Sequence, residues 1–92
     1  GVRSRMITNG RQTIGTSAVM VDGRTTQHSR LYIHNDDTTK DLYVGAEDVT
    51  PTNGFLIGKL ESKEFYLPPL NDIYMVSSGA THNVSWIRIA QD

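Results

Sequence analysis

The chain of 92 residues contains no cysteine, so no disulfide can cross-link it and no thiolate can bind a metal or act as a nucleophile. No apolar run approaches the roughly 20 residues that a transmembrane helix requires. No window shows apolar residues at the i, i+3, i+4, i+7 spacing of an amphipathic helix. The length allows one domain, and these absences favour a domain built from strands.

The net charge is only −1, yet the charges are unevenly distributed. Residues 1–30 hold five arginines and one aspartate, whereas residues 31–92 hold four basic and nine acidic side chains. We expect residues 1–11 to form a flexible basic arm that docks on an acidic neighbouring subunit; the alternative is a solvated tail with chance charge. The arginines are scattered and have no aromatic residues among them, so nucleic-acid binding is not expected.

Short alternating or apolar segments recur about every ten residues, separated by Gly, Asn, Asp, Pro and Ser. Residues 12–92 are therefore expected to form an all-β, single-domain antiparallel β-sandwich or jelly-roll-like barrel of about six to eight short strands. The expected strands are Gln12–Ser17 and Ala18–Val21, which can also form one kinked strand, then Arg30–Asn35, Asp41–Gly45, Gly54–Ile57, Glu64–Leu67, Asp72–Ser77 and Asn83–Ala90.

The segment LYIHNDDTTKDLYVG, residues 31–45, has an aliphatic–tyrosine–aliphatic pattern on both sides of a polar loop. Because successive side chains of a strand point to opposite faces, the aliphatic residues and the tyrosines are expected on opposite faces of a sheet. A register that places Tyr32 opposite Tyr43 leaves a four-residue loop, Asp36–Thr39, which is a common hairpin length. We therefore predict a hairpin with a cross-strand tyrosine pair.

The same alternation in later strands divides the large apolar residues into two sets. The set assigned to the core is Leu31, Ile33, Leu42, Val44, Phe65, Leu67, Ile73, Met75, Ile87 and Ile89. The set assigned to the opposite face is Tyr32, Tyr43, Tyr66, Tyr74 and Trp86. In one interpretation, loops or the N-terminal segment cover these rings, or the sheets curve around them. In the other, several rings share an outer surface that contacts a partner, since Tyr and Trp are enriched at interface hot spots.

Signals of chemistry are weak throughout the sequence. The three histidines do not follow the spacing of a zinc motif. NDDTTKD (35–41) and AEDVTPTNG (46–54) are acidic loops, but they lack the pattern of a calcium loop, and a weak incidental cation site is the alternative there. No serine-nucleophile turn or glycine-rich phosphate loop is present. We expect no catalytic residues, no metal and no cofactor.

The order of strand and turn segments resembles a known group of proteins. The order is RLYIHN (30–35), DLYVG (41–45), DVTPTNGFLI (48–57), EFYLPP (64–69), DIYMV (72–76) and NVSWIRIA (83–90). It resembles the small β-sandwich proteins and modules of tailed-bacteriophage particles, which include capsid decoration proteins and domains of head fibres and tails. The resemblance covers residues 12–90. It is loose at 58–63, where many such modules have a Pro-Gly-Glu turn.

The resemblance implies a non-enzymatic structural protein of the virion that forms a small homo-oligomer, commonly a trimer. The leading hypothesis is a capsid decoration protein that clamps adjacent copies of the major capsid protein, with no membrane partner. The residues expected to contact partners are Arg3, Arg5, Arg11, Tyr32, Tyr43, Tyr66, Tyr74 and Trp86.

Two other classes compete with this hypothesis. The first is a receptor-binding or carbohydrate-binding module of a phage tail or fibre, in which the same rings stack on sugars and the acidic loops at Asp36, Asp37 and Asp48 make polar contacts. The second is a cation-dependent hydrolase, which predicts that calcium or zinc raises the melting temperature.

Overall fold

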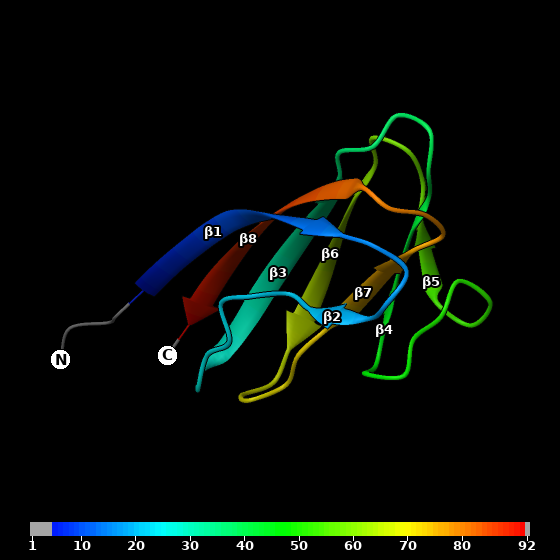
Figure 1. Cartoon of the computed structure of the whole chain (residues 1–92). Helices are drawn as coiled ribbons and strands as arrows, with labels where there is room; N and C mark the ends of the chain where they lie inside the picture. The colour runs from blue at the N-terminus through cyan, green and yellow to red at the C-terminus, as the bar shows by residue number, and fades with distance from the viewer. Residues whose placement is uncertain (1–4, 92) are drawn as a thin grey trace, which may run out of the picture.

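The computed structural model describes residues 5–91, which form two antiparallel four-stranded sheets and no helix (Figure 1). The strands are β1 (Arg5–Ile14), β2 (Val19–Met20), β3 (His28–Asn35), β4 (Leu42–Gly45), β5 (Phe55–Ile57), β6 (Ser62–Leu67), β7 (Tyr74–Ser77) and β8 (His82–Gln91). Sheet A has the order β1-β8-β3-β6, and sheet B has the order β2-β7-β4-β5. The predicted all-β antiparallel sandwich is confirmed. None of the described residues forms a helix that could cross a membrane.

The first strand corrects the predicted N-terminal arm. Residues 5–11 belong to the sandwich, because all of β1, from Arg5 to Ile14, pairs with β8 in antiparallel register. Residues 1–4 of the predicted arm, including Arg3, lie outside the described residues. The prediction of a flexible arm is therefore wrong for residues 5–11.

Apart from the core residue Ile14 at its end, the inward positions of β1 are small or polar, which explains why apolar alternation did not reveal most of this strand. A Cβ atom added to Gly10 would lie 3.1 Å from the ring of Trp86, so the glycine lets the indole pack directly against the backbone. Gln12 donates from Nε2 to the carbonyl of Met20 at 3.1 Å and accepts from the amide of Asp22 at 3.0 Å. The strand is thus attached by sheet hydrogen bonds and one glutamine, with few aliphatic side chains.

The predicted Tyr32–Tyr43 hairpin is also wrong. Strand β3 lies in sheet A and β4 in sheet B, so the loop between them crosses from one sheet to the other. Tyr32 lies opposite Ile87 and Glu64, whereas Tyr43 lies opposite Val76. Both strands turn their aliphatic residues toward the same core from opposite sides, so the alternation is satisfied without pairing.

The inner and outer faces of strand β8 are the reverse of those predicted. Trp86 is 8% exposed and packs in the core, while Ile87 is 37% exposed on the outer face and Ile89 is half-buried there. Alternation alone allows either face of this strand inward. Burial of the large indole, with Val84 beside it in the core cluster, favours the observed choice.

The core lies between the two sheets and contains most of the predicted residues. Of the predicted core set, Phe65 is half-buried at its margin, and Ile87 and Ile89 are on the outer face. The core cluster consists of Ile14, Val21, Leu31, Ile33, Leu42, Val44, Ile57, Leu67, Ile73, Met75, Val84 and Trp86.

Candidate functional site

The five rings predicted to contact a partner do not form one surface. Tyr32 and Tyr66 lie on the outer face of sheet A, and Tyr66 is 61% exposed. Tyr43 alternates with the buried residues of β4, and Tyr74 begins β7; both are half-buried on the face of sheet B opposite the core. Trp86 is in the core. The alternation separated rings from aliphatic residues correctly for the four tyrosines but placed the tryptophan on the wrong face.

The predicted basic residues have different positions. Arg5 begins β1, opposite Gln91, and Arg3 lies outside the described residues. Arg11 is exposed on the outer face of sheet A, in register with Ser85 of β8, which in turn is in register with His34 of β3. Of the predicted basic residues that the structure describes, only Arg11 lies beside a candidate binding site.

That site, here called the polar hollow, is a depression on the outer face of sheet A with a volume of about 620 Å³. It lies where β1 and β3 end and β8 begins, so three strands from distant parts of the sequence meet there. Its lining residues are Arg11, Gln12, Thr13, His34, Asp36, Asn83 and Ser85. Sequence reasoning found only Arg11 and Asp36, because the register that brings the others together depends on the β1–β8 pairing.

A second depression, here called the apolar hollow, adjoins the polar hollow along the same sheet face. Its volume is about 260 Å³, and it shares His34 and Ser85 with the polar hollow. The remaining lining residues are Tyr32, Ile33, Ser62, Trp86 and Ile87. The two depressions together form one site that is polar at one end and apolar at the other.

Asp36 is the centre of the hydrogen bonds at the polar hollow. One carboxylate oxygen accepts from Nδ1 of His34, and the other accepts from the hydroxyl of Ser85 at 2.5 Å. Burial opposes ionisation of this carboxyl, but the bonds from Ser85 and His34, with the charges of His34 and Arg11, lower its pKa below the ordinary value. The carboxylate stands between serine and histidine, so the imidazole is not placed to take the serine proton as a catalytic base does.

Several hydrogen-bond donors at the polar hollow remain free within residues 5–91. The hydroxyl of Thr13 donates to Oδ1 of Asn83 at 3.0 Å, which leaves the amide nitrogen of Asn83 available. Arg11 has no ion-pair partner within 4.0 Å in the described part of the chain. Since His34 uses Nδ1 toward Asp36, its Nε2 is the ring nitrogen left for a ligand. The hollow therefore suits a ligand that accepts hydrogen bonds and carries negative charge.

The acidic loop after β3 is organised as a turn. One oxygen of Asp37 accepts from the amides of Thr39 and Lys40 and from the hydroxyl of Thr39, at 2.7–2.8 Å, and the other lies 3.1 Å from Nζ of Lys40. These bonds hold the pKa of Asp37 well below its ordinary value. Residues 5–91 contain no group of three His, Asp or Glu side chains that could hold a metal ion.

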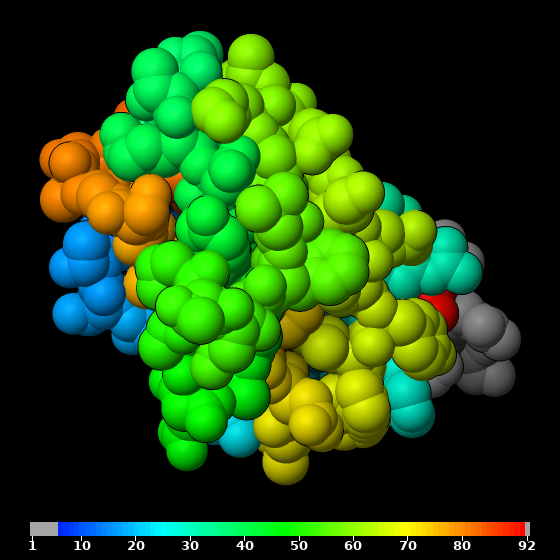
Figure 2. Space-filling model, turned by 90° about the vertical axis from the view of Figure 1, so that its right-hand side faces the viewer, coloured from blue at the N-terminus to red at the C-terminus, as the bar shows by residue number. Residues whose placement is uncertain are grey.

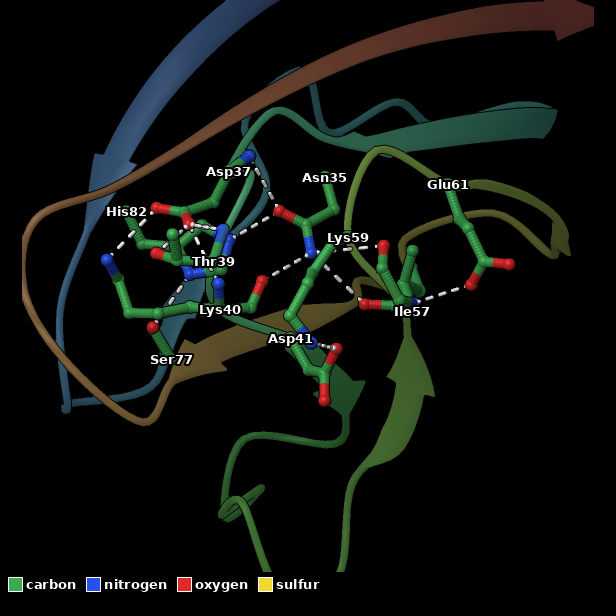
Figure 3. Close-up of polar contacts among 11 residues, drawn as sticks. Asn35, Asp37, Thr39, Lys40, Asp41, Ile57, Lys59, Glu61, Ser77 and His82 are labelled. Carbon is green, nitrogen blue, oxygen red and sulfur yellow. Dashed lines mark hydrogen bonds and ion pairs between the residues drawn. The ribbon is translucent and has the colours of Figure 1, made fainter.

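A network of buried polar groups joins the two sheets at the loop end of the sandwich (Figure 3). Nε2 of His82 in β8 lies 2.7 Å from Oδ1 of Asn35 in β3, and Nδ1 of His82 lies 2.7 Å from the hydroxyl of Ser77 in β7. All three residues are buried, and burial lowers the pKa of His82, although the charge of Asp37 opposes this. None of these three residues lines either of the two hollows described above.

The side of the sandwich between β5 and β6 is open and apolar. Phe55 is 57% exposed although it pairs with the core residue Val44, and its ring makes an edge contact with Phe65 at 6.0 Å between centroids. Leu56 points to the other face of β5 and is 48% exposed. This side, here called the β5 edge, faces the viewer in Figure 2, where β4, β5 and β6 are green to yellow-green.

No family model and no curated protein sequence matches the chain. A solved structure has a similar fold: a chain from a study of Bacillus endospore appendages, described as a novel family of disulfide-linked pili. It is 13% identical to this chain, with a TM-score of 0.68, and the match covers 99% of this chain and 90% of that one. The likeness supports the sandwich fold and nothing finer.

Proposed function

We propose that this protein is a non-enzymatic structural subunit of a multi-copy particle. In the finer form of the proposal it is a capsid decoration protein of a tailed bacteriophage, which forms a trimer and binds adjacent copies of the major capsid protein. The β5 edge supports the proposal most strongly. Two large apolar side chains, Phe55 and Leu56, project from opposite faces of an edge strand only three residues long.

Exposure of these apolar side chains to water is unfavourable in free energy, and covering them with a neighbouring protein is favourable. Phe55 belongs by register to the inner face, so a neighbour that covers this side would extend the core of the sandwich across the interface. The unpaired outer side of β5 also offers backbone groups to an incoming strand. Both features support a permanent neighbour rather than a freely diffusing monomer.

The similar fold of a pilus subunit also supports a role in a repeating assembly. That assembly is described as disulfide-linked, whereas this chain has no cysteine, so its subunits would associate through noncovalent contacts. The ring-stacking form of the carbohydrate hypothesis has less support, because Trp86 is buried and the four tyrosines are divided between the two sheets.

The test is the mass in solution by light scattering, together with occupancy on purified particles. We expect a trimer that binds particles, and a Phe55→Ser, Leu56→Ser double variant that is monomeric or fails to bind. Met6→Ser is the matched control, since Met6 is also an exposed apolar residue (61%) but lies on β1. A monomeric wild-type protein whose particle occupancy is unchanged by the double substitution would refute the proposal.

The basic start of the chain needs a separate test. Deletion of residues 1–10 would remove part of β1 and disturb the sandwich, so it cannot isolate a docking role. Deletion of residues 1–4 leaves β1 intact. If these residues help to anchor the protein, the shortened chain should keep its melting temperature and lose particle occupancy.

A further inference from the structure

The two joined hollows on the outer face of sheet A are not explained by the proposed assembly role. The β5 edge lies at the side of the sandwich where β5 faces β6, whereas the polar and apolar hollows lie on the outer face of sheet A, among β1, β3, β6 and β8. The volume of the polar hollow, about 620 Å³, is in the range of pockets that hold small molecules, and the apolar hollow adds about 260 Å³ beside it. A single carboxylate from a neighbouring protein would fill only a small part of this space.

The charged end of the site favours an anion. Arg11 offers a guanidinium group without an ion-pair partner in the described chain, and a guanidinium can bind a carboxylate with two parallel hydrogen bonds. Asn83 adds a free amide nitrogen, because its oxygen is already occupied by Thr13. The charge of Asp36 acts on Arg11, but no ion pair within 4.0 Å joins them in the described chain, and the two oxygens of Asp36 already accept from His34 and Ser85.

The other end of the site favours a ligand with an apolar face and hydroxyl groups. Ile87 lies opposite Tyr32 in the β8–β3 register, so their side chains adjoin on the outer surface. Two serines, Ser62 and Ser85, also line this hollow, and the hydroxyl of Ser85 donates to Asp36. A ring with C–H groups on one face and hydroxyls at its edge matches this combination.

We propose that the two hollows bind an acidic saccharide of the hexuronic acid class. Its carboxylate lies against Arg11 and Asn83, and the C–H face of the sugar or of its neighbour in the chain packs on Ile87 and Tyr32. The site differs from one built on stacked aromatic rings, because its affinity depends on the guanidinium. It is also independent of the assembly role, since each can exist without the other.

The test is a titration of the full chain followed by amide chemical shifts. Glucuronate should shift the signals of Arg11, His34, Asn83 and Ser85 in a saturable manner. Glucose, acetate and inorganic phosphate should each bind at least about tenfold more weakly, because each lacks either the charge or the sugar ring. Arg11→Gln should weaken glucuronate binding about tenfold, which is the usual effect of removing a charged hydrogen bond.

The matched control is Arg30→Gln. Arg30 is on the same outer face, but its Nε lies 3.8 Å from the carboxylate of Glu64 and outside both hollows, so binding should be unchanged. Asn83→Ser provides a second variant if Arg11→Gln lowers the melting temperature, and it should also weaken binding. The proposal is overturned if glucuronate does not saturate the signals, if acetate or phosphate binds equally well, or if Arg11→Gln and Asn83→Ser both bind like wild type.

Discussion

His82 and Asn35 are joined by a hydrogen bond of 2.7 Å between Nε2 of the imidazole and Oδ1 of the amide. The amide oxygen can only accept, so the imidazole carries a proton on Nε2. Its Nδ1 lies 2.7 Å from the hydroxyl oxygen of Ser77, which belongs to the other sheet and also lies 2.8 Å from the carbonyl of Gly79. One neutral histidine therefore connects sheet A to sheet B inside the protein, and this gives the fold a dependence on pH.

Acid should lower the free energy of unfolding before the carboxylates titrate. Burial lowers the pKa of His82 in the folded protein, while the unfolded chain takes up the proton near the ordinary value of about 6.5. The contribution of His82 to stability is therefore complete above that ordinary pKa and is lost progressively as the pH falls toward the lower folded pKa. Urea unfolding at about pH 7.5 and pH 5.5 should show lower stability in acid. In His82→Gln this difference should shrink, and an undiminished difference would show that another group is responsible.

Asn35 should tolerate substitution by aspartate very poorly. Its amide nitrogen donates to three carbonyls, those of Lys40, Ile57 and Gly58, at 2.9, 3.2 and 3.1 Å. A carboxylate at this buried position would turn an acceptor toward these acceptors. We expect Asn35→Asp to cost about 3 kcal/mol or more in the free energy of unfolding. The control is Asn9→Asp on the exposed face of β1, which should cost less than about 0.5 kcal/mol; similar costs for the two variants would contradict this reading.

The fold class was predictable because alternation is a strong signal wherever one face of a strand is buried and the other is not. Leu31 and Ile33 in β3, and Leu42 and Val44 in β4, are buried as the alternation predicted. The pairing of these strands was not predictable. A polar loop of hairpin length separates them, yet they do not pair with each other. Strand β3 pairs with β8 and β6, and strand β4 pairs with β7 and β5.

The candidate site was less predictable than the core. Its residues come from four strands, and most of β1 was hidden because its inward positions before Ile14, such as Gly10 and Gln12, are not aliphatic. In β8 both faces contain large apolar residues, so the alternation of side chains could not show whether Trp86 or Ile87 faces the core. The polar hollow depends on strand β1 and on the orientation of β8, since Arg11 and Asn83 adjoin only in the observed β1–β8 pairing.

Arg88 should be replaceable by an apolar residue with a gain in stability. The side chain is only 1% exposed, and neither Nε nor Nη2 has a hydrogen-bond partner within the described residues. Burial lowers the pKa of Arg88, and the charge of Asp72 opposes this. Arg88→Met should raise the free energy of unfolding by about 1–2 kcal/mol, measured by urea denaturation.

The companion variant Asp72→Asn separates charge compensation from other roles of this carboxylate. It should destabilise the wild type by about 1–3 kcal/mol, since it removes the anion that offsets Arg88. In the Arg88→Met background it should cost less, leaving only the partly exposed pair between Asp72 and Arg24, whose atoms are 3.4 Å apart. Equal costs in both backgrounds would mean that Asp72 does not act through Arg88.

Gly23 should be required by the packing of Trp86. Its φ of 85° lies in the left-handed region, and an added Cβ atom would stand 2.7 Å from Cη2 of the indole. Gly23→Ala is therefore expected to cost about 2–3 kcal/mol through backbone strain and displacement of the ring. The control is Gly15→Ala, where the nearest atom, Cβ of Ala80, is 3.5 Å away and φ is not left-handed, so the cost should stay below about 1 kcal/mol. Urea unfolding followed by the fluorescence of Trp86, the one tryptophan of the chain, measures both variants, and equal losses would refute the direct contact as the cause.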